Sequence, residues 1–363
     1  RQSARDHLRT VALAFWRGMK APTIAQAWAS GRNNFNVLRL VAAWMVIYGH
    51  AWAITGTAGQ DCITWLTQFK FAGAVAVDLF FVISGFLIAA SLQRNSVRNY
   101  LQARALRILP ALVTCVALSV FVLGPLLTTT SGYWHNLQTW RYLLLNASLW
   151  STTHTLPGVF EHLPYTAVNG SLWTLPGEAR LYLALLVASL CGVLTPRRYT
   201  PLWGLAMAGA YAFAVWRQPL PEMWTNYLWC TACFITGTLF WVNRARLRLQ
   251  AWPLLGLLAI AAATRGTVWF HLPYFALVTY GTLWLALIPA WPQIRHTDLS
   301  YGLYLYGWPM AQLVQTYAPG GPLHNMLAAT VLALLCAAGS WFAIERPALQ
   351  WKRRLSVANA SMH

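Results

Sequence analysis

Long, nearly uncharged stretches constrain the fold of this chain more than any other sequence feature. Several of them run for about 18 to 22 residues, and about 20 apolar residues cross the hydrocarbon core of a bilayer as a helix. Of the whole chain, 58% is hydrophobic and 9% is charged, whereas a soluble domain has about 25% charged residues. The alternating ten-residue segments typical of a porin barrel are missing. We therefore expect an all-α, polytopic membrane helix bundle.

The apolar stretches predict about ten transmembrane helices. We expect them at residues 37–55, 71–92, 108–128, 171–194, 201–217, 225–243, 251–264, 267–289, 298–317 and 325–343. The chain then divides into a basic segment (1–36), a transmembrane domain (37–343) and a tail (344–363). The longest outer region, residues 129–170, is aromatic and rich in helix breakers. Because loops of this length are commonly functional, we expect it to form a cap or an entrance.

The charge of the chain is +18, and its distribution points to topology rather than to nucleic acid. Between the predicted helices and at their ends, twenty Lys and Arg residues fall on the side of the two termini and four on the other side. Because positive loops stay inside, both termini are expected in the cytoplasm. The first 36 residues do not resemble a cleaved signal peptide. They are instead expected to contact anionic lipid headgroups.

Arg39 and His50 lie eleven residues apart in the first predicted span, in the segment RLVAAWMVIYGH. Eleven residues are about three helical turns, so the two side chains share one face, and they are separated by about 16 Å along the axis. An ionisable group inside a membrane is costly and usually faces a polar interior. A snorkelling Arg39 and a His50 bonded between helices are the structural alternatives. The shared face favours a polar channel with a base.

Two acidic residues, Asp78 and Glu178, also lie within predicted spans, and with Arg39 and His50 they could form one buried polar site. The sequence shows no metal-ligand spacing, no nucleophile elbow and no P-loop. Cys230 and Cys233 form a C-x-x-C pair without a second pair, so we interpret the cysteines as packing residues and expect no metal.

Six sequence blocks, taken in order, resemble the acyltransferase-3 family of integral membrane acyltransferases. They are the R-x10-H pair at 39–50, DLFFVISGFLI (78–88), RALRILPAL (104–112), SLWTLPGEARLYL (171–183), DLSYGLYLYGWP (298–309) and ERP (345–347). The resemblance covers residues 33 to 350, nearly the whole chain. One departure is Gly307, where many relatives carry histidine. The chain also ends soon after Arg354, and we therefore expect the stand-alone exopolysaccharide form of the family, the xanthan type.

The resemblance implies transfer of an acetyl group from cytoplasmic acetyl-CoA to a hydroxyl of an extracytoplasmic, lipid-linked sugar. It suggests catalytic roles for His50, Arg39 and Glu178, with His50 as base or acyl carrier. Arginine binds phosphate bidentately, so the cofactor-binding candidates are Arg104, Arg107 and Ser84. The acceptor-binding candidates are Asp78, Trp173, Tyr301 and Tyr304.

Structural alternatives stay open for several of these residues. Arg104 and Arg107 could be ordinary positive-inside charges. Residues 84–86 could mark a close helix contact, and the two tyrosines could be packing or interface residues. Two other functions also remain: a transporter or flippase for a lipid-linked saccharide or small molecule, and a structural subunit that recruits other enzymes. A transporter predicts related halves of the bundle, which the sequence does not show.

Overall fold

The computed structural model describes residues 21–217, 219–288, 291, 293–294 and 297–351, and their regular structure is helical apart from one isolated bridge. Residues 1–20 and 352–363, which hold most of the two predicted terminal segments, lie outside the described part. The longer helices are α3 (Phe35–Thr55), α5 (Ala72–Leu92), α6 (Val97–Leu118), α8 (Leu137–Ala147), α9 (Thr174–Leu190), α10 (Pro196–Trp216), α11 (Glu222–Val242), α12 (Trp252–Thr264), α13 (His271–Leu287), α14 (Ser300–Tyr317) and α15 (Pro322–Ser340).

The short elements are α2 (Ile24–Ala29), α4 (Cys62–Thr67), η1 (Ser119–Leu123), α7 (Gly124–Leu127), η2 (Tyr133–His135), η3 (Gly170–Trp173), η4 (Val268–Phe270) and η5 (Trp341–Glu345). Each of the ten predicted spans overlaps one of the longer helices. The largest difference is the third, expected from residue 108, because α6 begins at Val97. The Ser96 side chain caps this helix by accepting from the backbone N–H of Asn99, and Pro110 lies inside it.

In the described part of the chain, five helical segments are long and apolar enough to cross a membrane. They are Phe35–Thr55, Ala72–Leu92, Val97–Leu127, Val268–Leu287 and Pro322–Trp351. Helix α12 has 13 residues and is about 20 Å long at 1.5 Å per residue, shorter than a hydrocarbon core of about 30 Å. The number of ten crossings and the cytoplasmic termini therefore stay predictions, as do the domain boundaries.

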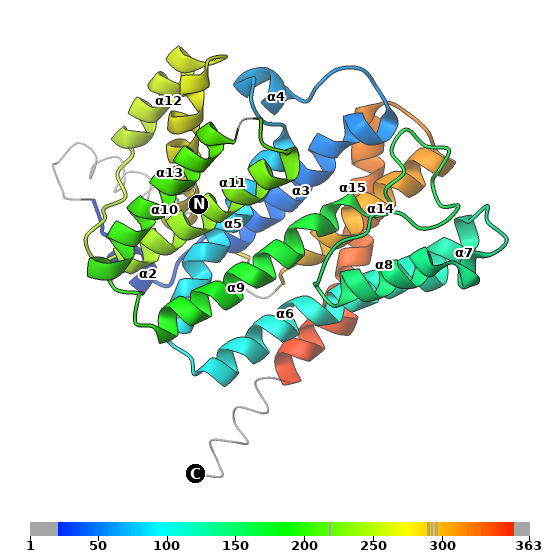
Figure 1. The fold of residues 1–363 in the computed structure, drawn as a ribbon, viewed down its shortest axis with the longest axis horizontal. Coiled ribbons are helices and arrows are strands. Elements are labelled where there is room, and N and C mark those ends of the chain that lie inside the picture. Colours follow the sequence, from blue (N-terminus) through cyan, green and yellow to red (C-terminus); the bar gives the residue numbers. More distant parts are fainter. Residues whose placement is uncertain (1–20, 218, 289–290, 292, 295–296, 352–363) are drawn as a thin grey trace, which may run out of the picture.

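Helix α5 lies at the centre of the bundle and contacts α3, α11, α13, α9 and α6 (Figure 1). Its contact with α11 is the closest, because glycines on both helices meet backbone. A Cβ added to Gly85 would lie 2.0 Å from the carbonyl oxygen of Phe234, and one added to Gly237 would lie 2.2 Å from that of Val82. Small residues let helices approach closely in membranes. The close-contact alternative for residues 84–86 thus holds for Gly85.

We expect Gly85→Ala to destabilise the bundle by about 1–3 kcal/mol, the usual cost of overpacking. Because the obstructing atom is backbone, α5 and α11 would have to separate. The measurement is the thermal unfolding midpoint of the detergent-solubilised protein. Gly204→Ala in α10 is the matched control, since nothing lies within 4 Å of its Cβ position, and it should not lower the midpoint. Equal midpoints for both variants would contradict the prediction.

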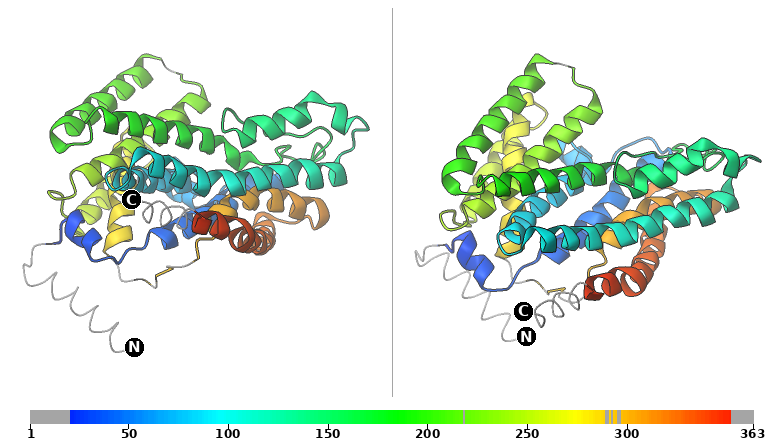
Figure 2. Two further views of the ribbon diagram at one scale, coloured as in Figure 1. Left: turned by 90° about the horizontal axis from the view of Figure 1, so that it is seen from below. Right: turned by 60° about the horizontal axis from the view of Figure 1, so that its bottom comes forward.

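The predicted cap region forms α8, which contacts α6, and a long irregular segment that returns to η3 (Figure 2). Side chains of α14 fix the end of this segment. The indole of Trp308 donates to the Ala167 carbonyl at 2.9 Å, and the amide of Gln312 donates to the same carbonyl at 2.7 Å. In the other direction, the Asn169 amide donates to the Leu305 carbonyl at 2.8 Å. The segment is therefore held against the bundle.

Candidate functional site

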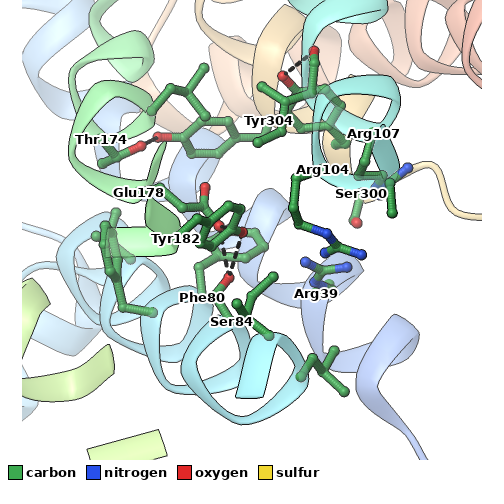
Figure 3. A pocket seen from close by; sticks show the side chains of 18 of the residues that line it. Arg39, Phe80, Ser84, Arg104, Arg107, Thr174, Glu178, Tyr182, Ser300 and Tyr304 are labelled. Atoms are coloured by element: carbon green, nitrogen blue, oxygen red, sulfur yellow. Dashed lines mark hydrogen bonds between the residues drawn. The ribbon is translucent and has the colours of Figure 1, made fainter. Parts of the chain in front are cut away.

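A cavity of about 520 Å³ is lined by most of the charged residues that the sequence analysis selected (Figure 3). We call it the inner cavity, because it lies at the Arg39 end of α3, which the charge distribution predicts to be cytoplasmic. It is lined by α3, α5, α6, α9 and α14. Arg39, Arg104 and Arg107 contribute three guanidinium groups, and Glu178 contributes one carboxylate. With three cations and one anion among these residues, the cavity is suited to an anionic ligand. A volume of this size is typical of small-molecule sites.

Arg107 is held by two carboxylates that come from distant parts of the chain. Its guanidinium lies 2.6 Å from Asp298 and 3.0 Å from Glu345. Asp298 also lies 3.9 Å from the guanidinium of Arg39, and Ser340 donates to Glu345 at 3.1 Å. This network ties α3, α6, the start of α14 and η5 together. It leaves Arg107 with much of its donor capacity already used.

Arg104 differs from Arg107, although it lies one turn earlier on the same helix. Among the described residues it has no ion-pair partner, and its Nε is buried without a hydrogen-bond partner. Figure 3 shows its guanidinium beside that of Arg39, inside the cavity. A buried polar atom without a partner is costly, and two adjacent guanidinium groups repel each other. Both costs are relieved when an anion binds, so Arg104 is the strongest anion-binding candidate.

On the opposite wall, Glu178 accepts hydrogen bonds from two hydroxyl groups. Ser84 Oγ donates to its Oε1 at 2.8 Å, and the Tyr182 hydroxyl donates to the same oxygen. Tyr182 follows Glu178 by four residues and therefore shares its helix face. The structure places Ser84 and Glu178 together with the arginines. Their hydrogen bonds hold the carboxylate on the cavity wall.

Tyr301 and Tyr304 also line the inner cavity. The Tyr301 hydroxyl donates to the Ile108 carbonyl at 2.9 Å, which ties α14 to α6. The Tyr304 hydroxyl lies 2.5 Å from the Ser171 carbonyl and 2.6 Å from Thr174 Oγ1. Both hydroxyls are thus engaged with the protein.

A second cavity of about 1160 Å³ is lined by His50, which lies farther along α3 than Arg39. We call it the outer cavity. The ring Nδ1 lies 2.7 Å from the Val46 carbonyl. Because a carbonyl only accepts, Nδ1 carries the proton, and in the neutral imidazole Nε2 is then the basic nitrogen. The ring lies against Phe71 and Trp308, at centroid distances of 5.0 and 4.7 Å. Gly73 makes room for it, since a Cβ there would lie 2.9 Å from the His50 ring. These contacts fix the orientation of the His50 ring.

Asp78 lines the outer cavity and is paired with Lys70. The Lys70 ammonium lies 2.8 Å from both carboxylate oxygens, and the Tyr274 hydroxyl donates to one of them at 2.8 Å. The ammonium also lies 4.4 Å from the centroid of the Trp229 ring, a favourable cation–π distance. The Asp78 side chain is only 1% exposed. These partners give Asp78 a structural role in the wall of the cavity.

Lys70→Met should destabilise the protein by about 3–5 kcal/mol, because Asp78 would remain as a buried charge without its partner. Thermal unfolding in detergent checks this. The double variant that combines Lys70→Met with Asp78→Leu removes both charges, and we expect it to recover most of the lost stability. A single variant as stable as the wild type would mean that the pair contributes nothing.

The two cavities lie along the same helices and share one lining residue, Val77. Helix α3 contributes Arg39 to the inner cavity and His50 to the outer one, and α14 contributes Tyr304 and Trp308 in the same way. The structure therefore brings Arg39, Ser84, Arg104, Arg107, Glu178, Tyr301 and Tyr304 together in the inner cavity, and His50, Asp78 and Trp173 in the outer one. The sequence suggested that Arg39, His50, Asp78 and Glu178 could form one buried polar site. The structure instead places Arg39 and Glu178 in the inner cavity and His50 and Asp78 in the outer one.

Several residues that line these cavities, or that pair with a lining side chain, did not emerge from the sequence analysis. Asp298 and Glu345 stand in two of the blocks quoted for the family resemblance, and Tyr182 lies one helical turn after Glu178. Lys70 lies just before the expected span 71–92 and pairs with Asp78, eight residues later. Within the described residues, no group of three or more His, Cys, Asp or Glu side chains could hold a metal ion. Cys230 and Cys233 are buried.

Comparison with known proteins places the chain in a family. Residues 32–345 match the family model described as an acyltransferase domain. The chain belongs to the acyltransferase-3 family. This acyltransferase is 28% identical over 341 residues to a protein of Shigella phage Sf6 named "O-acetyl transferase", with 86% of the chain and 95% of that protein covered. It is also 28% identical over 365 residues to "Nodulation protein 10" of Rhizobium leguminosarum bv. viciae, covering 90% and 97%. No solved structure matches it.

Proposed function

We propose that this acyltransferase is an inner-membrane O-acetyltransferase. It moves an acetyl group from cytoplasmic acetyl-CoA to a hydroxyl of an extracytoplasmic, lipid-linked exopolysaccharide repeat unit. The observation that carries the proposal is the pair of cavities, one with three arginines and one with His50, arranged along the same helices of a member of this family. The O-acetyl transferase of phage Sf6 supports the choice of acyl group. Family membership favours acyl transfer over the transporter and the structural subunit.

Acetyl-CoA would bind in the inner cavity. Its phosphates match guanidinium groups, which bind phosphate through two parallel hydrogen bonds. Arg104 is the main partner, since Arg107 is engaged with Asp298 and Glu345. Arg39 adds charge on the adjacent wall. The thioester end would extend past Val77, the residue common to both cavities, toward His50.

His50 would act at the outer end, where the acceptor hydroxyl is bound. Its unprotonated Nε2 can take the proton of that hydroxyl as the oxygen attacks the thioester carbonyl. It can alternatively accept the acetyl group itself and pass it on. In both routes the C–S bond breaks, the acetyl carbon ends on the sugar oxygen, and the proton ends on the thiol of coenzyme A. Glu178 lies in the inner cavity, and its role there is to hold Ser84 and Tyr182 at the donor.

The experiment uses the purified protein in nanodiscs, with acetyl-CoA labelled in the acetyl group. The acceptor is a lipid-linked saccharide fraction extracted from the membranes of the organism that encodes the protein. Label should appear in the saccharide and be released by mild alkali, as expected for an ester. Alkali-stable label would indicate a different acceptor group. Absence of both label transfer and coenzyme A binding would overturn the proposal.

The proposal requires the arginine cavity to open toward the cytoplasm. The positive-inside distribution predicts that a reporter fused after residue 354 is cytoplasmic. An alkaline phosphatase fusion there should be inactive, and a green fluorescent protein fusion should fluoresce. The reverse pattern would place the arginines on the outside and contradict a cytoplasmic donor.

A further inference from the structure

We infer that the outer cavity binds an uncharged saccharide unit and discriminates against uronic acids and other anionic sugars. This inference rests on the proposed function, because it concerns the acceptor of that reaction. It is carried by the charges and the aromatic groups that line the cavity.

The outer cavity has a surplus of negative charge. Asp61, Lys70, Asp78 and Glu222 are its charged lining residues, and Lys70 is neutralised by Asp78. Asp61 and Glu222 have no ion-pair partner within the described residues. Asp61 is fixed by the backbone N–H groups of Ile63 and Thr64 at 2.8 and 3.1 Å. Glu222 is exposed at the first turn of α11.

The two cavities differ in the cations that they offer to a ligand. Among the described residues, the inner cavity offers the anionic donor one guanidinium without a carboxylate partner, that of Arg104, whereas the outer cavity offers no cation that is free of a carboxylate. An acceptor carboxylate or phosphate there would meet like charges without a counter-ion. Like charges placed together at a binding site oppose binding strongly.

The remaining lining residues suit a neutral sugar. Trp52, Trp173 and Trp308 line the cavity, with Tyr165 among the other aromatic residues. Aromatic faces carry negative potential and therefore attract the weakly positive C–H groups on the face of a pyranose ring. Hydroxyl and amide side chains, such as that of Asn226, provide neutral hydrogen-bond partners.

The test compares two probes: a β-1,4-linked tetramer of glucose and the tetramer of glucuronic acid with the same linkage. Full-length protein in nanodiscs of zwitterionic lipid is examined at pH 8 by saturation-transfer NMR, without acetyl-CoA. We expect the glucose tetramer to bind at least about tenfold more tightly. Trp173→Ala should abolish this binding, which would locate it in the outer cavity. Equal binding, tighter binding of the glucuronic acid tetramer, or no binding of either probe would overturn the inference.

Variants and salt separate charge from shape. Glu222→Gln should raise binding of the glucuronic acid tetramer several-fold, and so should an increase in ionic strength, because salt screens exposed charges. Glu161→Gln is the matched control. It removes one negative charge from an exposed residue outside the cavity and keeps an oxygen to accept from the Gly158 N–H. Discrimination that neither Glu222→Gln nor salt reduces would contradict an electrostatic cause.

The two proposals can fail separately. Selective binding of the glucose tetramer by a protein that transfers no acetyl group would overturn the proposed reaction and leave the cavity assignment intact. Acetyl transfer by a protein that binds both probes equally would retain the reaction and overturn the inference about charge.

Discussion

Replacing His50 with alanine is expected to abolish detectable acetyl transfer while the protein still folds and inserts. A positioned acid–base group commonly contributes about 100- to 10,000-fold in rate, and His50 is the one histidine of α3. The structure supports retained folding, because His50 makes one hydrogen bond to a backbone carbonyl of its own helix. The removed ring would leave space within a cavity that is already open.

The measurement uses acetyl-CoA labelled in the acetyl group, first with acceptor and then without it. Label retained on the wild-type protein alone, in the absence of acceptor, would support the acyl-carrier route through His50. No retained label, with coenzyme A bound, would support direct transfer. His135→Ala is the control, since this histidine is exposed on the short helix η2 and should behave as wild type. Full activity of the His50→Ala variant would refute a catalytic His50.

Arg104→Ala is expected to weaken coenzyme A binding by about 10- to 100-fold, the range for losing hydrogen bonds to a charged group. The reason is that Arg104 has no competing carboxylate in the described part of the chain, so its binding capacity is available to a ligand. Stability should not fall, because within the described residues Arg104 makes no ion pair and its buried Nε has no hydrogen-bond partner. Isothermal titration calorimetry with coenzyme A, together with thermal unfolding, measures both effects.

Arg98→Ala is the matched control on the same helix, since Arg98 is exposed and lies outside the inner cavity. It should leave binding unchanged at physiological ionic strength. Arg107→Ala should differ from both variants by lowering stability, because Asp298 and Glu345 would lose their shared partner. If Arg104→Ala and Arg98→Ala bind coenzyme A equally well, Arg104 serves topology and not the donor.

The helices could be predicted from the sequence because each membrane helix satisfies its backbone hydrogen bonds locally. The expected 37–55 and the observed Phe35–Thr55 differ by two residues at one end. The start of α6 was missed, because its first turns carry Arg98, Arg104 and Arg107 and do not look apolar. The segments that are apolar and long enough to cross a membrane do not include α9, α10, α11 or α14, although each overlaps a predicted span.

The site could be predicted in composition but not in arrangement. The shared face of Arg39 and His50 follows from helix periodicity. Their separation into two cavities depends on side chains of other helices, such as Val77 and Tyr304. The spacing of residues within one helix does not predict where those side chains lie. The pairing of Arg107 with Asp298 joins residues 191 positions apart. No local pattern specifies such a contact, and the same holds for Glu345.

Val77 lines both cavities. In the proposed reaction this arrangement determines which charges have to cross the membrane. Coenzyme A is anionic, and moving one elementary charge across a membrane potential of 100 mV involves about 2.3 kcal/mol. In the proposed reaction the nucleotide stays with the arginines. The acetyl group passes outward while the proton of the acceptor hydroxyl passes inward to the thiol, so one group is exchanged for the other and no net charge is moved. The cell can therefore modify a molecule outside its membrane without exporting its coenzyme. The rate of acetyl transfer should accordingly be indifferent to the membrane voltage.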